Sequence, residues 1–484
     1  MGVLDVRPIF FIIGYLLLVL SGAMLVPMLA DLAAFNEDWQ VFAVSASLTL
    51  FFSVLLILTN RQAKVTLNLR QTFVLTSLAW IVVCLFSSLP FMLSSLRLGF
   101  ADGFFEAMSG LTTTGSTVII GLAEQPPGIL LWRSLLQWLG GIGIVGMGIV
   151  ILPFLRVGGM QLFRSESSEK TEKVMPRAAD LAIAFGWIYL ALTVACAILL
   201  GLAGMSTFDA ICHAMTAVAT AGFSTQDASI GYWREPAIHW VITVFMLIGS
   251  LPVVRYISLV KGDARPLLRD SQIRLFLGFV GVVCLLLTAW LYATTDMAIL
   301  DALRVATFNA VSVITTTGFS LGDYSAWGPP AVALFFVLLF TGGCTGSTTG
   351  GVKMLRYEIL WLVLRTQMTR LYSPRRVLPL TYNGKPVDAD VIISVMSFLA
   401  LYLGLTLLFS VLLALTGLDL VTAVTGVAQA LGNVGPGLGP VIGPAGNFRP
   451  LEDEAKWLLS LAMLLGRLEL FTLLVLLSPS FWRT

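Results

Sequence analysis

Charged residues are scarce in this chain: Asp, Glu, Lys and Arg make up 12% of its 484 residues, against roughly 25% in soluble domains. Histidine occurs only at His213 and His239, and neither lies in a cluster with metal-ligand spacing, which argues against a zinc site. The five cysteines are scattered through apolar runs without paired spacing, so they predict no disulfide framework. Neither a Ser–His pairing nor an H-E-x-x-H motif is present, which argues against an intramembrane enzyme.

Most of the chain is apolar. Hydrophobic residues make up 57% of the chain and the mean hydropathy is +0.91. Apolar runs of about 20 residues, the length that crosses a bilayer as a helix, recur throughout and begin with residues 8–30 and 41–58. The first run is longer than the apolar region of a signal peptide and no clear cleavage site follows, so we expect a retained helix. The sequence predicts an all-α integral membrane protein.

Four polar, glycine-containing runs interrupt this apolar sequence: TTTGS (112–116), ATAGFS (219–224), TTTGFS (315–320) and GNVGPG (432–437). The segments before them, EAMSGLTTTG, HAMTAVATAG, NAVSVITTTG and GVAQALGNVG, align position by position. Non-helical backbone at membrane depth persists only where protein or a water-filled path surrounds it. We therefore predict four re-entrant loops around one ion pore in a pseudo-fourfold arrangement.

The predicted organisation is a two-helix domain at 1–71 followed by four helix–pore-loop–helix repeats at 72–177, 178–270, 271–387 and 388–484. A second set of glycines marks the helix after each loop: Gly140, Gly249, Gly342 and Gly466. Each short helix before a loop starts near an acid that we expect to cap it: Asp102, Asp209, Asp301 and Asp419. Lys and Arg gather in 60–70, 156–177, 255–274 and 353–385, so the positive-inside rule places these segments in the cytoplasm.

Backbone carbonyls in the four loops are the candidate ligands for a cation. A bare cation is costly to move into a medium of low dielectric, and rings of carbonyl oxygens can replace its hydration shell. The runs contain no carboxylate, which favours a weakly held monovalent ion. Small-residue helix packing is the alternative explanation of the glycines. The carbonyls assigned to the filter belong to Thr113, Thr114, Gly115, Thr220, Ala221, Gly222, Thr316, Thr317, Gly318, Asn433, Val434 and Gly435.

At these residues the chain resembles the TrkH and KtrB group of potassium transporters, a superfamily that includes the plant HKT proteins and within which it is most like bacterial TrkH. The resemblance covers essentially the whole length and extends to TGGCTGSTTGGVK (341–353) and LLGRLELFTLLVL (464–476). In plant relatives Ser at the first loop glycine accompanies sodium selectivity, so Gly115 implies K⁺. The resemblance also implies a homodimer among membrane lipids of the bacterial inner membrane, without nucleic acid. It further implies a cytosolic, nucleotide-binding RCK ring like TrkA, acting on basic segments such as 164–177 and 365–376.

Two features are candidate gates. The Gly-rich loop at 341–351 should break its helix, because each glycine costs about 1 kcal/mol relative to alanine. The resemblance assigns a gating role to this loop, which Lys353 follows; a packing hinge is the alternative. Its glycines are Gly342, Gly343, Gly346, Gly350 and Gly351. Arg467 stands alone in an apolar stretch and, at about 8 Å from a cation, would repel it by roughly 2 kcal/mol; pairing with Glu469 or with a carbonyl is the alternative.

The main rival function is a secondary transporter that couples Na⁺ or H⁺ in symport to uptake of potassium or of an organic solute. Broken helices around a midplane site are typical of such transporters. They would show inverted or two-fold repeats and buried acids or amides at the substrate. The four parallel copies favour channel-like potassium uptake instead.

Overall fold

The computed structural model describes residues 4–62, 67–150, 174–376, 380–383 and 385–483. Helices make up nearly all of its regular structure, and one short hairpin joins β1 (Thr381–Tyr382) to β2 (Lys385–Pro386). Within the described residues seven helices are long and apolar enough to cross a membrane, or up to nine if each of two bent pairs is one span. The prediction of a helical membrane protein is confirmed.

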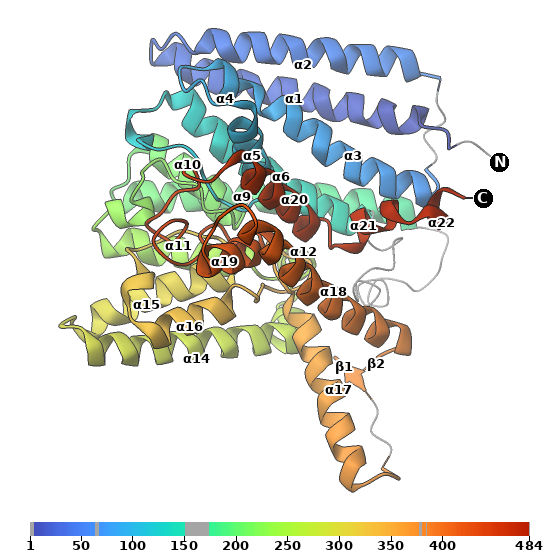
Figure 1. Ribbon diagram of the computed structural model, residues 1–484, viewed down its shortest axis with the longest axis vertical. Helices are drawn as coiled ribbons and strands as arrows, with labels where there is room; N and C mark the ends of the chain where they lie inside the picture. The colour runs from blue at the N-terminus through green and yellow to red at the C-terminus, as the bar shows by residue number, and fades with distance from the viewer. Residues whose placement is uncertain (1–3, 63–66, 151–173, 377–379, 384, 484) are drawn as a thin grey trace.

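Two long helices at the edge of the bundle begin the chain: α1 (Arg7–Ala33) and α2 (Trp39–Asn60). They pack against each other along their length (Figure 1), where Ser53 donates a 2.7 Å hydrogen bond to the Gly14 carbonyl. A Cβ on Gly14 would lie 2.8 Å from the Ile57 side chain, so the small residue permits this close packing. The Asp31 carboxylate near the end of α1 accepts a 2.6 Å hydrogen bond from the Gly128 amide, which connects this pair to the rest of the bundle.

The same order of elements then occurs four times: a long helix, a half-helix that leads into a re-entrant loop, and a second helix. We call these units the first to fourth repeats. Their long helices are α3 (Leu69–Ser87), α9 (Val174–Leu202), α14 (Ser271–Thr294) and α18 (Ala389–Ala414). Their half-helices are α5 (Phe100–Leu111), α10 (Thr207–Val218), α15 (Ile299–Ile314) and α19 (Leu420–Gly432).

The second helices differ among the repeats. The first repeat has one helix, α6 (Pro127–Val150), whereas the others are divided into α11 (Pro236–Gly249) and α12 (Val253–Val260), α16 (Pro329–Leu338) and α17 (Met354–Tyr372), and α20 (Asp453–Arg467) and α21 (Phe471–Leu474). Short helices complete the chain: α4 (Leu89–Leu93), α13 (Arg265–Arg269), α22 (Pro479–Trp482) and the 3₁₀ turns Leu122–Glu124, Ser229–Tyr232, Tyr324–Ala326 and Val475–Leu477. Helix α17 projects away from the bundle (Figure 1).

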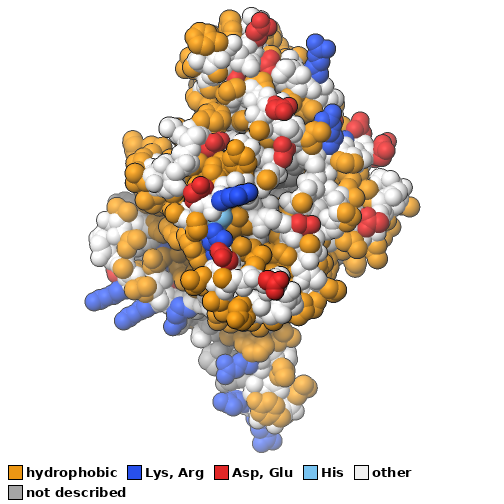
Figure 2. All heavy atoms as spheres, turned by 90° about the vertical axis from the view of Figure 1, so that its left-hand side faces the viewer, with side chains coloured by type: hydrophobic (Ala, Val, Ile, Leu, Met, Phe, Trp, Pro, Cys, Tyr) orange, Lys and Arg blue, Asp and Glu red, His pale blue; other side chains and the backbone are white. Residues whose placement is uncertain are grey.

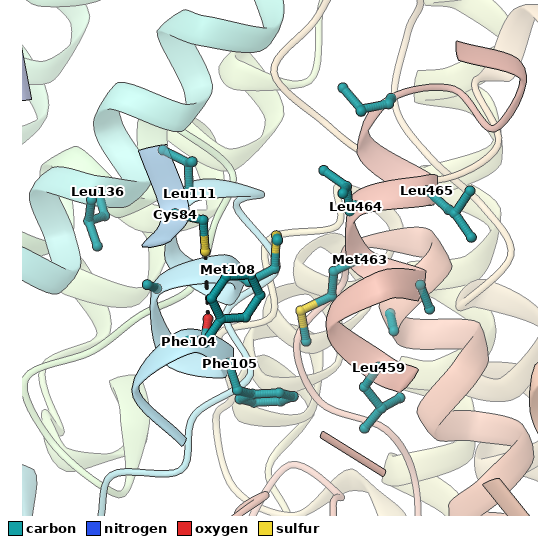
Figure 3. Close-up of a cluster of buried hydrophobic side chains, with 14 of the residues drawn as sticks. Cys84, Phe104, Phe105, Met108, Leu111, Leu136, Leu459, Met463, Leu464 and Leu465 are labelled. Carbon is teal, nitrogen blue, oxygen red and sulfur yellow. Dashed lines mark hydrogen bonds between the residues drawn. The ribbon is translucent and has the colours of Figure 1, made fainter. Parts of the chain in front are cut away.

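The first and last repeats pack together through apolar side chains. On α5, Phe105 and Met108 face Leu459 and Met463 of α20 (Figure 3), and all four are almost fully buried. The Cys84 thiol of α3 lies 3.6 Å from the Phe104 carbonyl of α5 (Figure 3). This contact brings segments about 350 residues apart in sequence together, so the four repeats form a closed bundle.

The second set of glycines allows the second helices to touch the half-helices. A Cβ on Gly140, Gly249 or Gly466 would lie 1.9, 2.8 or 2.1 Å from the carbonyl oxygen of Leu111, Val218 or Leu431, respectively. Each of these carbonyls is four residues before a loop glycine, so one contact recurs in three repeats. In the third repeat a Cβ on Gly342 would instead lie 2.4 Å from the Gly350 carbonyl oxygen, because the chain there has left the helix.

Candidate ion pathway

All four half-helices end in the same backbone geometry. The amide just before each loop glycine bonds to the carbonyl five residues earlier, as in a Schellman motif. These bonds are Thr114 to Ser109 (2.9 Å), Ala221 to Thr216 (2.9 Å), Thr317 to Ser312 (2.8 Å) and Val434 to Gln429 (2.9 Å). Each half-helix therefore ends at an equivalent position and sends its chain into a loop of equivalent shape.

The residue two positions before each loop glycine adopts left-handed backbone angles. The values of φ are +54° at Thr113, +50° at Thr220, +53° at Thr316 and +52° at Asn433. A β-branched residue is rare in this conformation, which costs roughly 1–2 kcal/mol, whereas Asn tolerates it better. Such strain is typical of functional sites. The fourth run has Asn433 where the other three have threonine, and its backbone angle is nevertheless the same.

Contacts between the loops close a ring. A Cβ on Gly115 would lie 2.4 Å from the Ala221 carbonyl oxygen of the second loop. A Cβ on Gly222 would lie 1.9 Å from Thr317 O, one on Gly318 would lie 2.1 Å from Val434 O, and one on Gly435 would lie 2.9 Å from Thr114 O. Each loop glycine thus lies against the next loop, and the fourth lies against the first. Positive φ values of 81–110° at these glycines add a second reason for the absence of a side chain.

Two carbonyls of this ring accept hydrogen bonds from protein side chains. The Gln137 amide Nε2 donates to Ala221 O at 2.6 Å, and the Ser116 hydroxyl donates to Gly435 O at 2.8 Å. A backbone carbonyl has two lone pairs and can accept a second interaction. The eight residues assigned to the filter that are not glycine are all fully buried. The structure brings all four runs together.

The Gly-rich loop lies directly next to this ring. It belongs to the non-helical stretch between α16 and α17, so the predicted helix break is confirmed. Thr348 Oγ1 lies 3.0 Å from Thr220 Oγ1, and the Gly350 amide donates to Thr316 Oγ1 at 2.8 Å. A Cβ on Gly350 would lie 2.4 Å from the Gly432 carbonyl. The loop therefore contacts the second, third and fourth repeats at the base of their re-entrant loops.

Arg467 also holds the Gly-rich loop. Its Nη1 donates to the Thr348 carbonyl at 3.0 Å and its Nη2 donates to the Gly140 carbonyl of α6 at 3.3 Å, and the side chain is almost fully buried. Pairing with a carbonyl, one of the two alternatives for this arginine, is therefore present. The other, pairing with Glu469, is wrong, because the Glu469 carboxylate bonds to Arg356.

Lys353 and Arg356 place further positive charge beside the loop. Lys353 is buried, and its ammonium group bonds to the carbonyl and, at 3.2 Å, to the hydroxyl of Thr349. The Arg356 guanidinium lies over the Phe398 ring, 3.7 Å from its centroid. The Arg356 guanidinium is paired with the Glu469 carboxylate. In the described structure Lys353 and Arg467 bond instead to carbonyls of the loop, so they bring positive charge close to it.

Two further helix breaks escaped sequence reasoning. Helices α11 and α12 meet at 98°, and α20 meets α21 at 106°. The first break is held by hydrogen bonds from the Cys344 amide to Ser250 O (2.9 Å) and from the Val253 amide to Gly346 O (3.0 Å). Pro252 is a local signal for it, because a residue before proline avoids helical angles. At the second break Glu469 and Leu470 have φ values of +61° and +52°, which their residue types do not announce.

The expectation that an acid caps each half-helix is correct only for Asp419, which accepts hydrogen bonds from the amides of Val421 and Thr422. Asp102, Asp209 and Asp301 lie within the first turn instead. Ser206 caps α10, whereas the residues at the N-cap positions of α5 and α15, Gly99 and Ala298, make no side-chain cap hydrogen bond in the described structure. There the acids serve contacts with side chains: Asp102 with Lys456 (2.7 Å), Asp209 with Thr225 (2.6 Å) and Asp301 with Arg304 (2.7 Å).

The two histidines make hydrogen bonds inside the protein. His213 bonds to the Ser224 hydroxyl, so the expectation that no serine pairs with a histidine is wrong; its other ring nitrogen bonds to the Asp209 carbonyl. His239 bonds to the Trp233 carbonyl. No group of three or more His, Cys, Asp or Glu at metal-binding distance occurs in the described part of the chain. Figure 2 shows acidic side chains spread over the face of the bundle that lies at the left of Figure 1, and Lys and Arg gathered on the projecting α17 end.

The basic segments expected to meet a partner are described only in part. Residues 164–173 of the segment 164–177 lie outside the described residues. The segment 365–376 covers the end of α17 and the turn after it, and Arg365 and Arg370 of this helix are exposed.

The fold thus defines a multi-pass membrane protein built around four re-entrant loops. The sequence model of the TrkH family, described as a cation transport protein, matches residues 39–484. The Trk system potassium uptake protein TrkI of Halomonas elongata is 44% identical over 98% of this chain and 97% of its own length. TrkH of Escherichia coli K12 is 38% identical over 99% of each chain.

A solved structure agrees with these sequence matches. The crystal structure of the potassium transporter TrkH from Vibrio parahaemolyticus superposes with a TM-score of 0.92 and 37% identity, covering 99% of this chain and 100% of that one. The chain belongs to the TrkH family of cation transport proteins, a family of transporters rather than enzymes, and is a multi-pass protein of the bacterial inner membrane.

Proposed function

We propose that this protein takes up K⁺ by conducting it through the ring of four re-entrant loops. The observation that carries the proposal is the cyclic order of contacts, in which Gly115, Gly222, Gly318 and Gly435 each lie against the carbonyl of the next loop. Four chain segments arranged in this way surround one axis. The Trk potassium uptake proteins that the chain matches along nearly its whole length support K⁺ as the substrate.

The chemistry of the ring suits a monovalent cation. The assigned carbonyls of Thr113, Thr114 and Gly115, and of the equivalent residues in the other loops, would replace the hydration shell of the ion. The loops carry no carboxylate, so a divalent ion would find no compensating negative charge there. The half-helices end at the ring, and their C-terminal carbonyls add partial negative charge that favours a cation.

The Gly-rich loop and Arg467 are the proposed gate. Hydrogen bonds to Thr220 and Thr316 hold the loop against the ring, and Arg467 bonds it to the fourth repeat. A guanidinium beside a conduction path lowers the local concentration of cations. Conduction in this scheme requires the loop to withdraw from the ring.

Helix α17 is the proposed link to a cytosolic regulator. It begins at Met354, immediately after the Gly-rich loop, and projects away from the bundle (Figure 1). A nucleotide-binding RCK ring of the TrkA type that binds the basic end of α17 would move the loop through a continuous helix. The family resemblance also supports a homodimer with one ion path in each protomer.

The proposal is tested by ⁸⁶Rb⁺ uptake into proteoliposomes that contain the purified protein, with K⁺ and Na⁺ as competitors. Uptake should be inhibited by K⁺ much more strongly than by Na⁺. Passive conduction predicts that uptake follows the membrane potential alone, whereas symport predicts acceleration by an inward Na⁺ or H⁺ gradient at constant potential. Saturable uptake of an organic solute without Rb⁺ flux would contradict the proposal and favour a solute transporter.

A further inference from the structure

One position of the half-helices anchors the chain that leaves each re-entrant loop. Nine residues before the loop glycine stand Glu106, His213, Asn309 and Gly426 in the four repeats. Glu106 accepts a 2.9 Å hydrogen bond from the Val118 amide, and Asn309 accepts one of 3.0 Å from the Leu321 amide. Both amides belong to the third residue after the loop glycine, so the two contacts are equivalent.

The other two repeats achieve the same anchoring with different groups. The His213 ring lies 3.0 Å from the Ser224 hydroxyl, two residues after its loop glycine. Gly426 has no side chain, and its neighbour Thr425 accepts a 3.1 Å hydrogen bond from the Leu438 amide, again three residues after the glycine. In each repeat a polar side chain of the half-helix thus anchors the chain just after the loop glycine. The group is a carboxylate, an imidazole, an amide or a hydroxyl.

Only the first repeat uses a charged anchor, and it is paired. Arg133 of α6 donates through Nε to Glu106 at 2.8 Å, with side-chain exposures of 1% and 0%. Thr117 donates to the carboxylate at 2.9 Å and lies 3.1 Å from Arg133 Nη2. Every polar atom of this pair has a partner, which is the condition under which a buried ion pair is tolerated.

Arg133 also reaches into the second repeat. Its Nη1 donates to the Ser224 carbonyl at 2.8 Å, and its guanidinium carbon lies 4.0 Å from the centroid of the Phe223 ring. One turn further along α6, Gln137 donates to Ala221 O at 2.6 Å and accepts from the Phe223 amide at 2.9 Å. The same face of α6 therefore contacts three residues that flank the second loop glycine: Ala221, Phe223 and Ser224.

The other junctions have apolar residues at the positions that correspond to Arg133 and Gln137. Counted back from the second glycine of each repeat, these positions are Ile242 and Met246, Phe335 and Leu339, and Leu459 and Met463. Apolar packing is non-directional, whereas the Arg133 fork fixes both distance and angle. The junction between the first and second loops is thus defined by directional polar contacts from α6.

We propose that Glu106 and Arg133 are positioning residues that set the spacing between the first and second loops and thereby the discrimination between K⁺ and Na⁺. The inference rests on the proposed function, since it assumes that the ring carries the ion. The pair connects Val118 of the first loop to Ser224 of the second, which are three and two residues beyond the loop glycines. The two cations have the same charge and differ in size, so their discrimination depends on where the ring holds its oxygens.

The test measures Rb⁺ and Na⁺ flux in proteoliposomes for three variants of the full chain. Glu106→Gln keeps the shape but removes the negative charge. Thr117→Val removes only the hydroxyl between the pair, and the double variant Glu106→Gln/Arg133→Met leaves neither charge unpaired. Trp132→Phe is the matched control. Trp132 is the neighbour of Arg133 on α6 and is equally buried, but it donates its hydrogen bond away from the loops, to Ser87 O at 3.1 Å.

We expect the Rb⁺-to-Na⁺ flux ratio to fall roughly tenfold in Glu106→Gln and in the double variant, because the directional charge-assisted bonds are lost. Thr117→Val should give a smaller fall, and Trp132→Phe should keep the ratio while lowering the thermal midpoint. If Glu106→Gln yields no folded protein, the other two variants decide. An unchanged ratio in folded variants of a selective protein overturns this inference alone. Absence of Rb⁺ flux in the unsubstituted chain overturns the proposed function and the inference with it.

Discussion

Replacement of Arg467 by alanine should increase K⁺ flux. The guanidinium makes two hydrogen bonds, to Thr348 O at 3.0 Å and to Gly140 O at 3.3 Å, and the first of these holds the Gly-rich loop. A hydrogen bond to a charged group contributes about 1.5–3 kcal/mol. If that bond exists only while the loop occupies the ring, its loss shifts the loop towards the withdrawn state by this amount.

The charge of Arg467 acts in the same direction. At a separation of about 8 Å and an effective dielectric constant near 20, a unit positive charge raises the energy of a passing cation by roughly 2 kcal/mol. Each effect of about 2 kcal/mol corresponds to roughly a thirtyfold change in an equilibrium. Because a step other than loop withdrawal will limit flux once the loop is free, we expect a gain of about ten- to a hundredfold rather than the full product.

Rb⁺ uptake into proteoliposomes measures this gain, and two variants separate its causes. Arg467→Lys keeps the charge but cannot span both carbonyls, so it should raise flux less than Arg467→Ala if repulsion dominates and equally if the hydrogen bonds dominate. Arg449→Ala is the control, because it removes an exposed arginine of the same repeat. Unchanged or lower flux through a well-folded Arg467→Ala protein would refute the reasoning.

Three further substitutions test other parts of the structure. Gly140→Ala should lower the free energy of unfolding by about 1–3 kcal/mol through overpacking, since its Cβ would lie 1.9 Å from Leu111 O. Gly143→Ala on the same helix is the control, because its Cβ would lie 3.9 Å from the nearest atom, and thermal melts in detergent compare the two variants. Gly115→Ser should raise Na⁺ flux relative to Rb⁺ flux, because its Cβ would displace the Ala221 carbonyl, and an unaltered ratio would argue against this carbonyl as a ligand. Asp419→Ala should cost about 1 kcal/mol as a lost cap, while Asp301→Ala, which removes no cap, should melt close to the unsubstituted protein.

The re-entrant loops were predictable because their signal is local and repeated. A glycine after a short polar run recurs in four aligned segments, and the structure brings Gly115, Gly222, Gly318 and Gly435 into one ring. The break at 341–351 was predictable for a similar reason, because several glycines in a short stretch have poor helix propensity. The assignment of the ring as a filter and of the loop as a gate stays a prediction.

Tertiary contacts account for what the sequence did not reveal. Glu106 and Arg133 lie 27 positions apart, and nothing in either segment announces that they meet. Leu470 adopts positive φ although its type disfavours it, because the surrounding structure fixes the chain there. All four acids near the half-helices were expected as caps, but Asp102 instead pairs with Lys456 of the fourth repeat, a contact that the local sequence does not reveal.

The closure of the ring through its last member has a consequence for biosynthesis. Ser116 binds the Gly435 carbonyl across 319 residues of sequence, so the first loop lacks one of its two neighbours until the fourth has been made. At a synthesis rate of about 5–20 residues per second this delay is roughly 16–64 s. A nascent chain that already carries three repeats thus holds an incomplete ring in the bilayer. Ribosome stalling or truncation in this interval would leave an unsealed polar groove, a natural substrate for membrane quality-control proteases.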